Sequence, residues 1–470
     1  CSIRSIWVLG KVFEDAVVYT CVPTLINSMP RPDDTTEITL SEELNVYGIE
    51  PVFEIKQAKW LDNPYARIEY FISPSINDLL DKIARQCCRL DERCDVAQGL
   101  TAYDRYQGQD KEIIQNRAYH ADRKKDETFR RWLAGSDVSR YALDWSGEWI
   151  SYGPWLAAPR RPQIFKEPRL LLREVPGANR RIQATFCNDE LYYGHSVIPV
   201  LKKSESIDYD LACLLSIVNS RLLTFYGRIR LPNFAKDTFP KLNPSDVSAL
   251  PIRRVDFTTL AEEREALFTE VTSKADEAIE LLTASDTLGA ATPMDRALLA
   301  QDAAPVLDFA AARLDADPEQ VDVVHDLLAH LAERMIAMHK AKQDQVEAFW
   351  LDLEGVTDPE TFEALKEHGK WESSLAKAPA CRPFVDAESR STRHLDESLA
   401  WNEDCFKAFV KMLAGRVTAL SDVMAVYRAH HADQQARVHQ IAATDWLIDQ
   451  VVYRLYGLTE EEVAVVEGRG

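Results

Sequence analysis

Residues 129–155 read FRRWLAGSDVSRYALDWSGEWISYGPW, and this stretch decides the fold of the middle of the chain. Two interpretations of its aromatic side chains are open. They can form the core of an irregular β-rich domain, or they can be stacking platforms for bases with cation–π support from arginine. Because aromatics bury a large area, the core interpretation is favoured for any single tryptophan. The aromatics are Trp132, Tyr141, Trp145, Trp149, Tyr152 and Trp155, interleaved with or followed by Arg130, Arg131, Arg140, Arg160 and Arg161.

The charge of the surrounding region has the opposite sign to that of the whole chain. Residues Gly99 to Val255 hold 25 Lys and Arg against 18 Asp and Glu, a local net charge of +7 in a chain whose net charge is −20. The remainder therefore sums to −27. A basic section of this kind is the electrostatic footprint of a nucleic-acid-binding module, although a basic segment can also offset acidic neighbours within one fold.

Length and composition set the class of protein. With 470 residues, 46% hydrophobic and 28% charged, we expect a globular chain of about three domains. No run of 18 apolar residues predicts a membrane span, and no signal-peptide pattern opens the chain. The chain starts with Cys and directly on a strand-like segment, so we expect a piece of a longer polypeptide. Its scattered cysteines favour a reducing cytoplasm.

The N-terminal part predicts a small sheet followed by a helix. The runs SIWVLG and AVVYTCVPTLIN within residues 5–27 predict two adjacent strands of a buried sheet, and VFEIK predicts an edge strand after a Pro- and Asp-rich loop. A helix is expected from Ser73 to Cys94, with Pro74 in its first turn. Cys87 and Cys94 would then share a helical face without completing a zinc site.

The rest of the chain changes from short strands to helices. Residues Leu211 to Tyr226 predict one apolar helix of about four turns inside the basic region. From about Asp256 the spacing of apolar residues predicts amphipathic helices of an acidic bundle. Its histidines fit no metal-binding frame and are expected to be solvated or capping side chains. They are His325, His330, His339, His430 and His431.

Catalytic patterns in the sequence are sparse. Asp33, Glu54 and Lys56 have the layout of a magnesium-dependent nuclease site, but the pattern is permissive. Asp62-Asn63-Pro64-Tyr65 resembles the tetrapeptide that holds a flipped adenine in amino-methyltransferases, yet it lacks the second proline and favours a turn. No glycine-rich phosphate loop occurs. The sequence therefore indicates recognition rather than chemistry.

Several motifs in order resemble one protein family. VFEDAVVYTCVPTLIN (12–27) resembles the last strands of the methyltransferase domain in type IIG restriction-modification enzymes and their bacterial phage-defence relatives. The middle is similar to the TaqI-like specificity domain that follows there. Its matching strings are VAQGLTAYDR with Gly99 and Thr101, FRRWLAGSDVSRY with Gly135 and Asp137, WISYGPW, FKEPRLLLREV, YYGHSVIPVLK, LLSIVNSRLLTFYGR and FPKLNPSDVSALPI. The tail TDWLIDQVVYRLYGLTEEEVAVVE, with Asp449, Tyr453, Tyr456 and Gly457, also matches.

The resemblance implies a function for the complete protein and a limited part for this chain. In such enzymes the S-adenosylmethionine loop and the Asn-Pro-Pro-Tyr or Asn-Pro-Pro-Phe motif lie upstream. We therefore expect no catalytic, cofactor-binding or metal residues here, S-adenosylmethionine-dependent adenine-N6 methylation by the whole, and sequence selection by this part. The expected partners are double-stranded DNA and the missing methyltransferase domain or subunit, with no membrane. The expected DNA-binding residues are Arg105, Arg160, Arg161, Lys166, Arg180, Arg181, Arg228, Arg230 and Lys236, whereas Arg169 and Arg173 flank an apolar run and suit a structural role.

The predicted fold class is α+β. We expect terminal strands of a methyltransferase-like domain in residues 1–60, a connecting helix in 61–98, a target-recognition domain in 99–255 and a helical region in 256–470. The partial sheet would complete a methyltransferase sheet, and alone its exposed edge favours aggregation. Two alternatives stay open. One is an acidic helical scaffold that docks a protein, and the other is a nuclease built on Asp33, Glu54 and Lys56.

Overall fold

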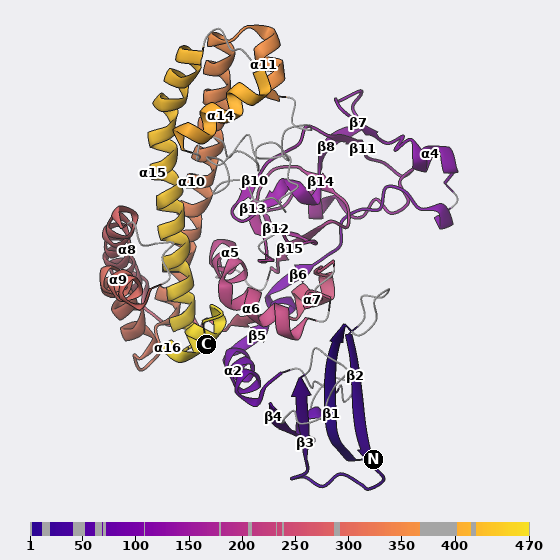
Figure 1. Cartoon of the computed structure of the whole chain (residues 1–470), viewed down its shortest axis with the longest axis vertical. Coiled ribbons are helices and arrows are strands. Elements are labelled where there is room, and N and C mark those ends of the chain that lie inside the picture. Colours follow the sequence, from indigo (N-terminus) through magenta and orange to yellow (C-terminus); the bar gives the residue numbers. More distant parts are fainter. Residues whose placement is uncertain are drawn as a thin grey trace. The chain divides into compact units, whose positions relative to one another are not determined.

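The computed structural model divides the chain into two compact units, Cys1–Cys87 and Cys88–Gly470. Small sheets come first and helices fill the C-terminal part, so the predicted α+β layout is confirmed (Figure 1). The predicted division at residues 60, 98 and 255 stays a prediction. The structure describes residues 2–11, 19–40, 52–61, 68, 72–107, 109–177, 180–204, 209–231, 233–236, 239–285, 292–366, 402–414 and 420–469.

The first unit is built on a four-stranded sheet with the strand order β2-β1-β3-β4. β1 pairs antiparallel with β2 and parallel with β3, and β4 pairs antiparallel with β3. The two strands expected in residues 5–27 and the edge strand are therefore confirmed. β3 was not predicted, because its threonines follow directly on the Pro- and Asp-rich loop. The strands are β1 (Ser2–Lys11), β2 (Tyr19–Ile26), β3 (Thr35–Leu40) and β4 (Phe53–Lys56).

The core of this sheet is small and its outer strand is exposed. Ile6, Ile38 and Ile55 are buried beside a buried Trp60, which lies on the short helix α1 (Ala58–Leu61). On β2, in contrast, Val22 is 52% and Leu25 is 58% exposed. The prediction of a buried sheet is therefore wrong for β2, which is an edge strand with apolar side chains in solvent.

The helix expected from Ser73 to Cys94 is shorter than predicted. α2 (Pro74–Arg85) begins as expected, because the Ser73 hydroxyl caps it and Pro74 occupies its first turn. It ends at Arg85, and Cys87, Cys88 and Cys94 lie in strands rather than on one helical face. Sheet pairing within the second unit overrides the helical pattern there. The elements that replace its end are β5 (Cys87–Arg89), α3 (Leu90–Arg93) and β6 (Cys94–Val96).

The middle of the second unit consists of short strands in two four-stranded sheets and two smaller pairs. One sheet has the order β14-β8-β11-β7 and the other the order β13-β12-β15-β6, in which all neighbours are antiparallel. The small pairs are β9 with β10 and β5 with β16. The elements are α4 (Lys111–Gln115), β7 (His120–Ala121), β8 (Phe129–Leu133), β9 (Val138–Ser139), β10 (Ala142–Leu143), β11 (Trp149–Ser151), β12 (Arg169–Arg173), β13 (Ala184–Cys187), β14 (Tyr192–Tyr193), β15 (Val197–Lys202), α7 (Pro244–Ser248) and β16 (Pro251–Arg253).

The apolar run after β15 forms two helices instead of one. α5 (Leu211–Asn219) is buried at every position, and α6 (Arg221–Arg230) follows after Ser220. The Ser220 hydroxyl donates to the carbonyl of Ile217 at 2.7 Å and accepts from the amide of Leu223 at 3.2 Å. One serine therefore ends the first helix and caps the second, which the continuous apolar pattern hid.

The C-terminal region is helical, as predicted. The long helices α10 (Val321–Val356) and α15 (Leu420–Leu455) run side by side, and α10 also packs on α5 (Figure 1). No helix in the described part of the chain is long and apolar enough to cross a membrane. The remaining helices are α8 (Ala261–Ala284), α9 (Pro293–Leu314), α11 (Pro359–Lys366), α14 (Glu403–Ala414) and α16 (Glu460–Val466).

Candidate nucleic-acid interface

Most of the aromatic stretch 129–155 forms the core of the middle region. Trp132 is 9% exposed and belongs to one cluster with Phe165. Trp145 and Tyr152 are partly buried and pack against the same cluster. Trp155 differs, because 41% of its surface is exposed. The core interpretation is therefore confirmed for Trp132, and base stacking is open to Trp155 alone among these four tryptophan and tyrosine side chains.

Arg169 is a structural residue, as the sequence indicated. Its guanidinium is fully buried on β12. Nε donates to the Tyr193 hydroxyl at 3.0 Å, Nη1 to the carbonyl of Glu167 at 2.7 Å and Nη2 to that of Asp189 at 3.0 Å. A guanidinium held in this way satisfies buried carbonyls that would otherwise lack donors. It therefore braces the sheet and is out of reach of a ligand in solvent.

The structure corrects the expectation for Arg181. Its side chain is only 13% exposed, and Nη1 lies 3.1 Å from Asp445 Oδ2 on α15. Arg140 donates to the same carboxylate at 2.9 Å, and both arginines also donate to the carbonyl of Asn219. The acid lies 264 residues downstream of Arg181, so no spacing pattern indicates the pairing. Arg181 therefore binds the helical region to the middle of the unit instead of facing duplex DNA.

A second carboxylate completes this buried cluster. Asp449 accepts from the backbone amide of Arg221 at 2.8 Å and from its Nε at 3.1 Å, so it caps the start of α6. Burial raises the pKa of Asp449 to about 6. The same burial acts on Asp445, but there Arg140 outweighs it and lowers the pKa to about 2.

The C-terminal motif holds its helices on the same unit. The Tyr456 hydroxyl donates to the carbonyl of Pro251 at 2.9 Å and accepts from the amide of Arg253 at 3.2 Å. Gly457 then takes a left-handed conformation, with φ at +67°, and ends α15. These motif residues, with Asp449, therefore anchor α15 and α16 to α6 and β16.

The other eight expected DNA-binding residues lie in loops and helix ends of the second unit. Arg180 and Arg230 are half-buried, and Lys166 pairs with Glu190 at 3.3 Å. The other five are exposed, and none has a recorded carboxylate partner in the described part of the chain. Cations of this kind are available for phosphates. They are Arg105, Arg160, Arg161, Arg228 and Lys236.

Arg160 is the most constrained of the five. Its backbone is left-handed, with φ at +64°, a conformation that is costly for a side chain with Cβ. Its Nε donates to the carbonyl of Gly99 at 3.2 Å, and its own carbonyl accepts from the Tyr152 hydroxyl at 3.1 Å. The left-handed backbone and these two hydrogen bonds fix the position from which the side chains of Arg160 and Arg161 extend.

Two exposed aromatic side chains were not predicted. Tyr106 is 87% exposed next to Arg105, whose guanidinium lies 5.4 Å from the ring centre. Phe239 is 90% exposed and has φ at +53°. A large aromatic rarely stays in solvent with a left-handed backbone unless the position is used. The signal in the sequence was their position beside Arg105 and Lys236, because stacking and phosphate contacts act together on nucleic acids.

The nuclease pattern does not assemble. Lys56 lies 3.5 Å from Asp33, so its cation is paired with the acid of the pattern. In the register of β3 and β4, Glu54 lies opposite Glu37, whereas Lys56 lies opposite Thr35. Asp33 and Glu54 are therefore separated along the sheet. The Asn-Pro pattern at residues 62–65 lies outside the described residues.

Three of the five histidines have hydrogen-bond or ion-pair partners, whereas Nε2 of His330 has none among the described residues. His325 Nε2 accepts from the amide of Asp210 at 2.9 Å, which places it at the start of α5. His430 lies 2.8 Å from Asp352, and His431 lies 3.0 Å from the Tyr427 hydroxyl. Among the residues that the structure describes, no group of three His, Cys, Asp or Glu side chains is placed to hold a metal.

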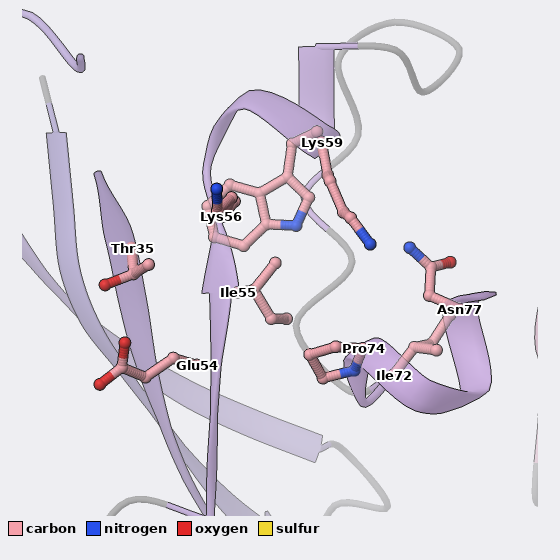
Figure 2. A pocket seen from close by; sticks show the side chains of 9 residues that line it. Thr35, Glu54, Ile55, Lys56, Lys59, Ile72, Pro74 and Asn77 are labelled. Carbon is pink, nitrogen blue, oxygen red and sulfur yellow. The ribbon is translucent and has the colours of Figure 1, made fainter. Parts of the chain in front are cut away.

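A pocket of about 320 Å³ lies in the first unit, between β4, α1 and the start of α2 (Figure 2). Its floor is apolar, with Ile55, Ile72 and Pro74. At its rim Lys59 and the Asn77 amide point toward one another (Figure 2), and Lys59 pairs with Asp78 at 3.0 Å. None of the expected DNA-binding residues lines it. Glu54 and Lys56 of the nuclease pattern also line the pocket, and Lys56 is paired there with Asp33 at 3.5 Å.

Part of the pH dependence of stability is expected to come from His339, whose ring stacks on Tyr141; burial also lowers the pKa of His120 to about 4. Burial lowers the pKa of His339 to about 4, with Lys342 and Arg140 adding to the shift and Asp445 opposing it. The folded chain resists protonation of this ring, so stability falls as the pH drops from about 6.5 to 4. One ring contributes up to about 3 kcal/mol to this loss.

We therefore expect His339→Phe to reduce the difference in the free energy of unfolding between pH 7 and pH 4.5. Unfolding in guanidinium chloride at the two pH values measures this difference. The exposed His195→Phe is the control and should keep the slope of the parent. Asp449 changes in the opposite direction, since its raised pKa favours the folded state as pH falls below about 6, but it is present in all three chains. Equal slopes for the two variants would contradict the assignment.

Comparison with known proteins identifies the middle of the chain. Residues 130–252 match the family model of the TaqI-like C-terminal specificity domain, which confirms the resemblance seen in the motifs. No curated protein matches the chain. Among solved structures, the chain is similar to the type IIL restriction-modification enzyme MmeI, solved in complex with DNA, at 14% identity and a TM-score of 0.32. The match covers 72% of this chain and 46% of that one, so the chain spans just under half of its length.

Proposed function

We propose that this chain, whose residues 130–252 form a TaqI-like C-terminal specificity domain, recognises a specific duplex DNA sequence within a restriction-modification system. The family match is the observation that carries the proposal. The exposed cations without carboxylate partners support it, because phosphate contacts supply most of the affinity of such proteins and need free positive charge. The local charge of +7 between Gly99 and Val255 has the sign that this requires.

Recognition divides between two kinds of contact. Arg105, Arg160, Arg161, Arg228 and Lys236 would hold phosphates and so fix the register of the protein on the duplex. Side chains on the same loops would read base edges in the major groove. Tyr106 is a candidate for such a contact, since it stands in solvent beside Arg105.

The chemistry would belong to the rest of the protein. The proposal follows the resemblance in assigning adenine-N6 methylation with S-adenosylmethionine to a type IIG-like enzyme or a phage-defence relative in the cytoplasm. This chain would position the target for a catalytic domain or subunit that it does not contain. The position of β2 at the end of its sheet supports such a partner, because an upstream strand would pair with its outer backbone N–H and C=O groups.

Removing the charges of Arg160 and Arg161 tests the interface. Each phosphate contact contributes about 0.9 to the slope of log K against log salt. The double variant Arg160→Gln/Arg161→Gln should therefore bind duplex DNA with a slope smaller by about 2 and with lower affinity at every salt concentration. Fluorescence anisotropy with a labelled duplex measures both.

The matched control removes the same charge elsewhere. Lys340 on α10 and Lys407 on α14 are exposed cations of the helical region. Lys340→Gln/Lys407→Gln should leave the slope unchanged. If both double variants reduce the slope equally, long-range charge explains the binding and the interface is misplaced.

A further inference from the structure

A cleft of about 660 Å³ lies between α6 and the end of the chain in the second unit. Its volume falls within the range of small-molecule sites. One wall comes from the specificity domain and the other from the C-terminal helix α16 and the residues after it. The lining residues are Arg181, Arg221, Thr224, Phe225, Arg228 and Ile229 on the first wall, and Val465, Val466, Glu467 and Gly468 on the second.

The charge of the cleft is positive. Arg221 and Arg228 are seven residues apart and so lie on one face of α6, about 10 Å apart along its axis. Glu467 is the carboxylate among the lining residues, and it already accepts from Arg469 at 2.8 Å and from the Tyr453 hydroxyl at 3.4 Å. The guanidiniums of the cleft are therefore not neutralised from the opposite wall.

Two of the three arginines have donors available to a ligand. The side chain of Arg221 is 53% exposed, and its recorded bond to Asp449 uses Nε at 3.1 Å, which leaves the terminal nitrogens toward solvent. Arg228 is exposed and has no recorded carboxylate partner in the described ranges of the chain. Arg181 is held behind them by Asp445 and contributes charge. Guanidinium forks match the oxygens of a phosphate group better than any other anion-binding side chain.

Four of the other lining residues are apolar and half-buried, beside Thr224, Glu467 and Gly468. Phe225 and Ile229 on α6 face Val465 and Val466 across the cleft. An inorganic anion would gain nothing from contact with these apolar side chains, whereas the sugar or base attached to a phosphate would bury them from water. We propose that this cleft binds the phosphate ester of a nucleotide unit, with Arg221 and Arg228 on the phosphate and the apolar walls on the sugar or base.

Two sources supply this chemistry, the backbone of a DNA strand and a free nucleotide. The DNA source rests on the proposed function, and the free nucleotide does not. The experiment uses the full chain and compares Arg228→Gln with Lys340→Gln as the matched loss of one exposed cation. The probes are adenosine 5′-monophosphate, followed by calorimetry, and a labelled 24-base-pair duplex, followed over a salt series. Val466→Glu repeats the test from the opposite wall by placing a carboxylate in the cleft.

A free-nucleotide site gives monophosphate binding that Arg228→Gln and Val466→Glu weaken at least tenfold and Lys340→Gln does not. A backbone site gives no monophosphate binding, and the duplex salt slope falls by about one in the cleft variants alone. Equal behaviour of all three variants with both probes overturns the inference. Nucleotide binding without duplex binding would contradict the proposed function and support the nucleotide site in the cleft. Sequence-selective duplex binding that the cleft variants do not change would support the proposed function and contradict the site.

Discussion

Replacing Asp445 with alanine should lower the free energy of unfolding of the second unit by about 3–5 kcal/mol, the cost of removing one member of a buried ion-pair cluster. The carboxylate is shared by Arg140 and Arg181, whose side chains are 17% and 13% exposed. Arg140 would keep the carbonyl of Asn219 as an acceptor, and Arg181 would keep the same carbonyl and the carboxylate of Asp449, 3.7 Å from its Nη2. Unfolding in guanidinium chloride, followed by far-UV circular dichroism, measures the change in the free energy of unfolding.

The control for this change lies on the same helix. Asp433 on α15 is exposed, and Asp433→Ala should change the free energy of unfolding by no more than about 0.5 kcal/mol. Asp445→Asn should be intermediate, because an amide keeps one hydrogen-bond acceptor but not the charge. If Asp445→Ala costs no more than Asp433→Ala, the cluster does not hold α15 on the specificity domain.

Replacing Gly99 with alanine should cost about 2–3 kcal/mol, in the range of an overpacked core site. A Cβ at Gly99 would lie 2.1 Å from the carbonyl oxygen of Gly194 and 2.6 Å from that of Tyr193. Both contacts are with backbone, so neither can be relieved by a rotamer change. The chain would separate at the bridge between Leu100 and Gly194, where the amide of Leu100 donates to the Tyr193 carbonyl at 2.9 Å.

This substitution should also affect DNA binding. The Gly99 carbonyl accepts from Arg160 Nε at 3.2 Å, so moving it releases the side chain that we place on phosphate. Gly355→Ala is the matched control, because a Cβ there meets nothing within 4 Å on an exposed position of α10. It should stabilise the chain by up to about 1 kcal/mol. A Gly99→Ala chain as stable as the Gly355→Ala chain would show that the bridge is looser than the structure has it.

Local sequence patterns predicted the elements that tertiary packing does not change. The β-branched runs within residues 5–27 form β1 and β2, and the aromatic stretch fills a core around Trp132. Ser220 shows where local reasoning failed. The apolar run continues past Ser220 without interruption. Its hydroxyl, however, hydrogen-bonds to the end of one helix and the start of the next. A hydrophobic pattern does not indicate such caps.

The sequence predicted which region carries the candidate interface, but not all of the residues that form it. Loop position alone suggested Arg160 and Arg161, which are exposed, and Arg181, whose side chain is only 13% exposed. What separates them is an acid on α15 more than 260 residues away, and no spacing rule reaches that far. Phe239 was missed for a related reason, since an aromatic in a proline-rich segment predicts core until its 90% exposure is seen.

Selection of one DNA sequence by this chain can be measured by enrichment from a pool of random duplexes over a salt series. The purified chain should bind with a steep salt dependence, and the bound fraction should contain one enriched motif. Steep binding without enrichment would leave a basic surface that has no specificity of its own. Absence of binding at low salt would contradict the account.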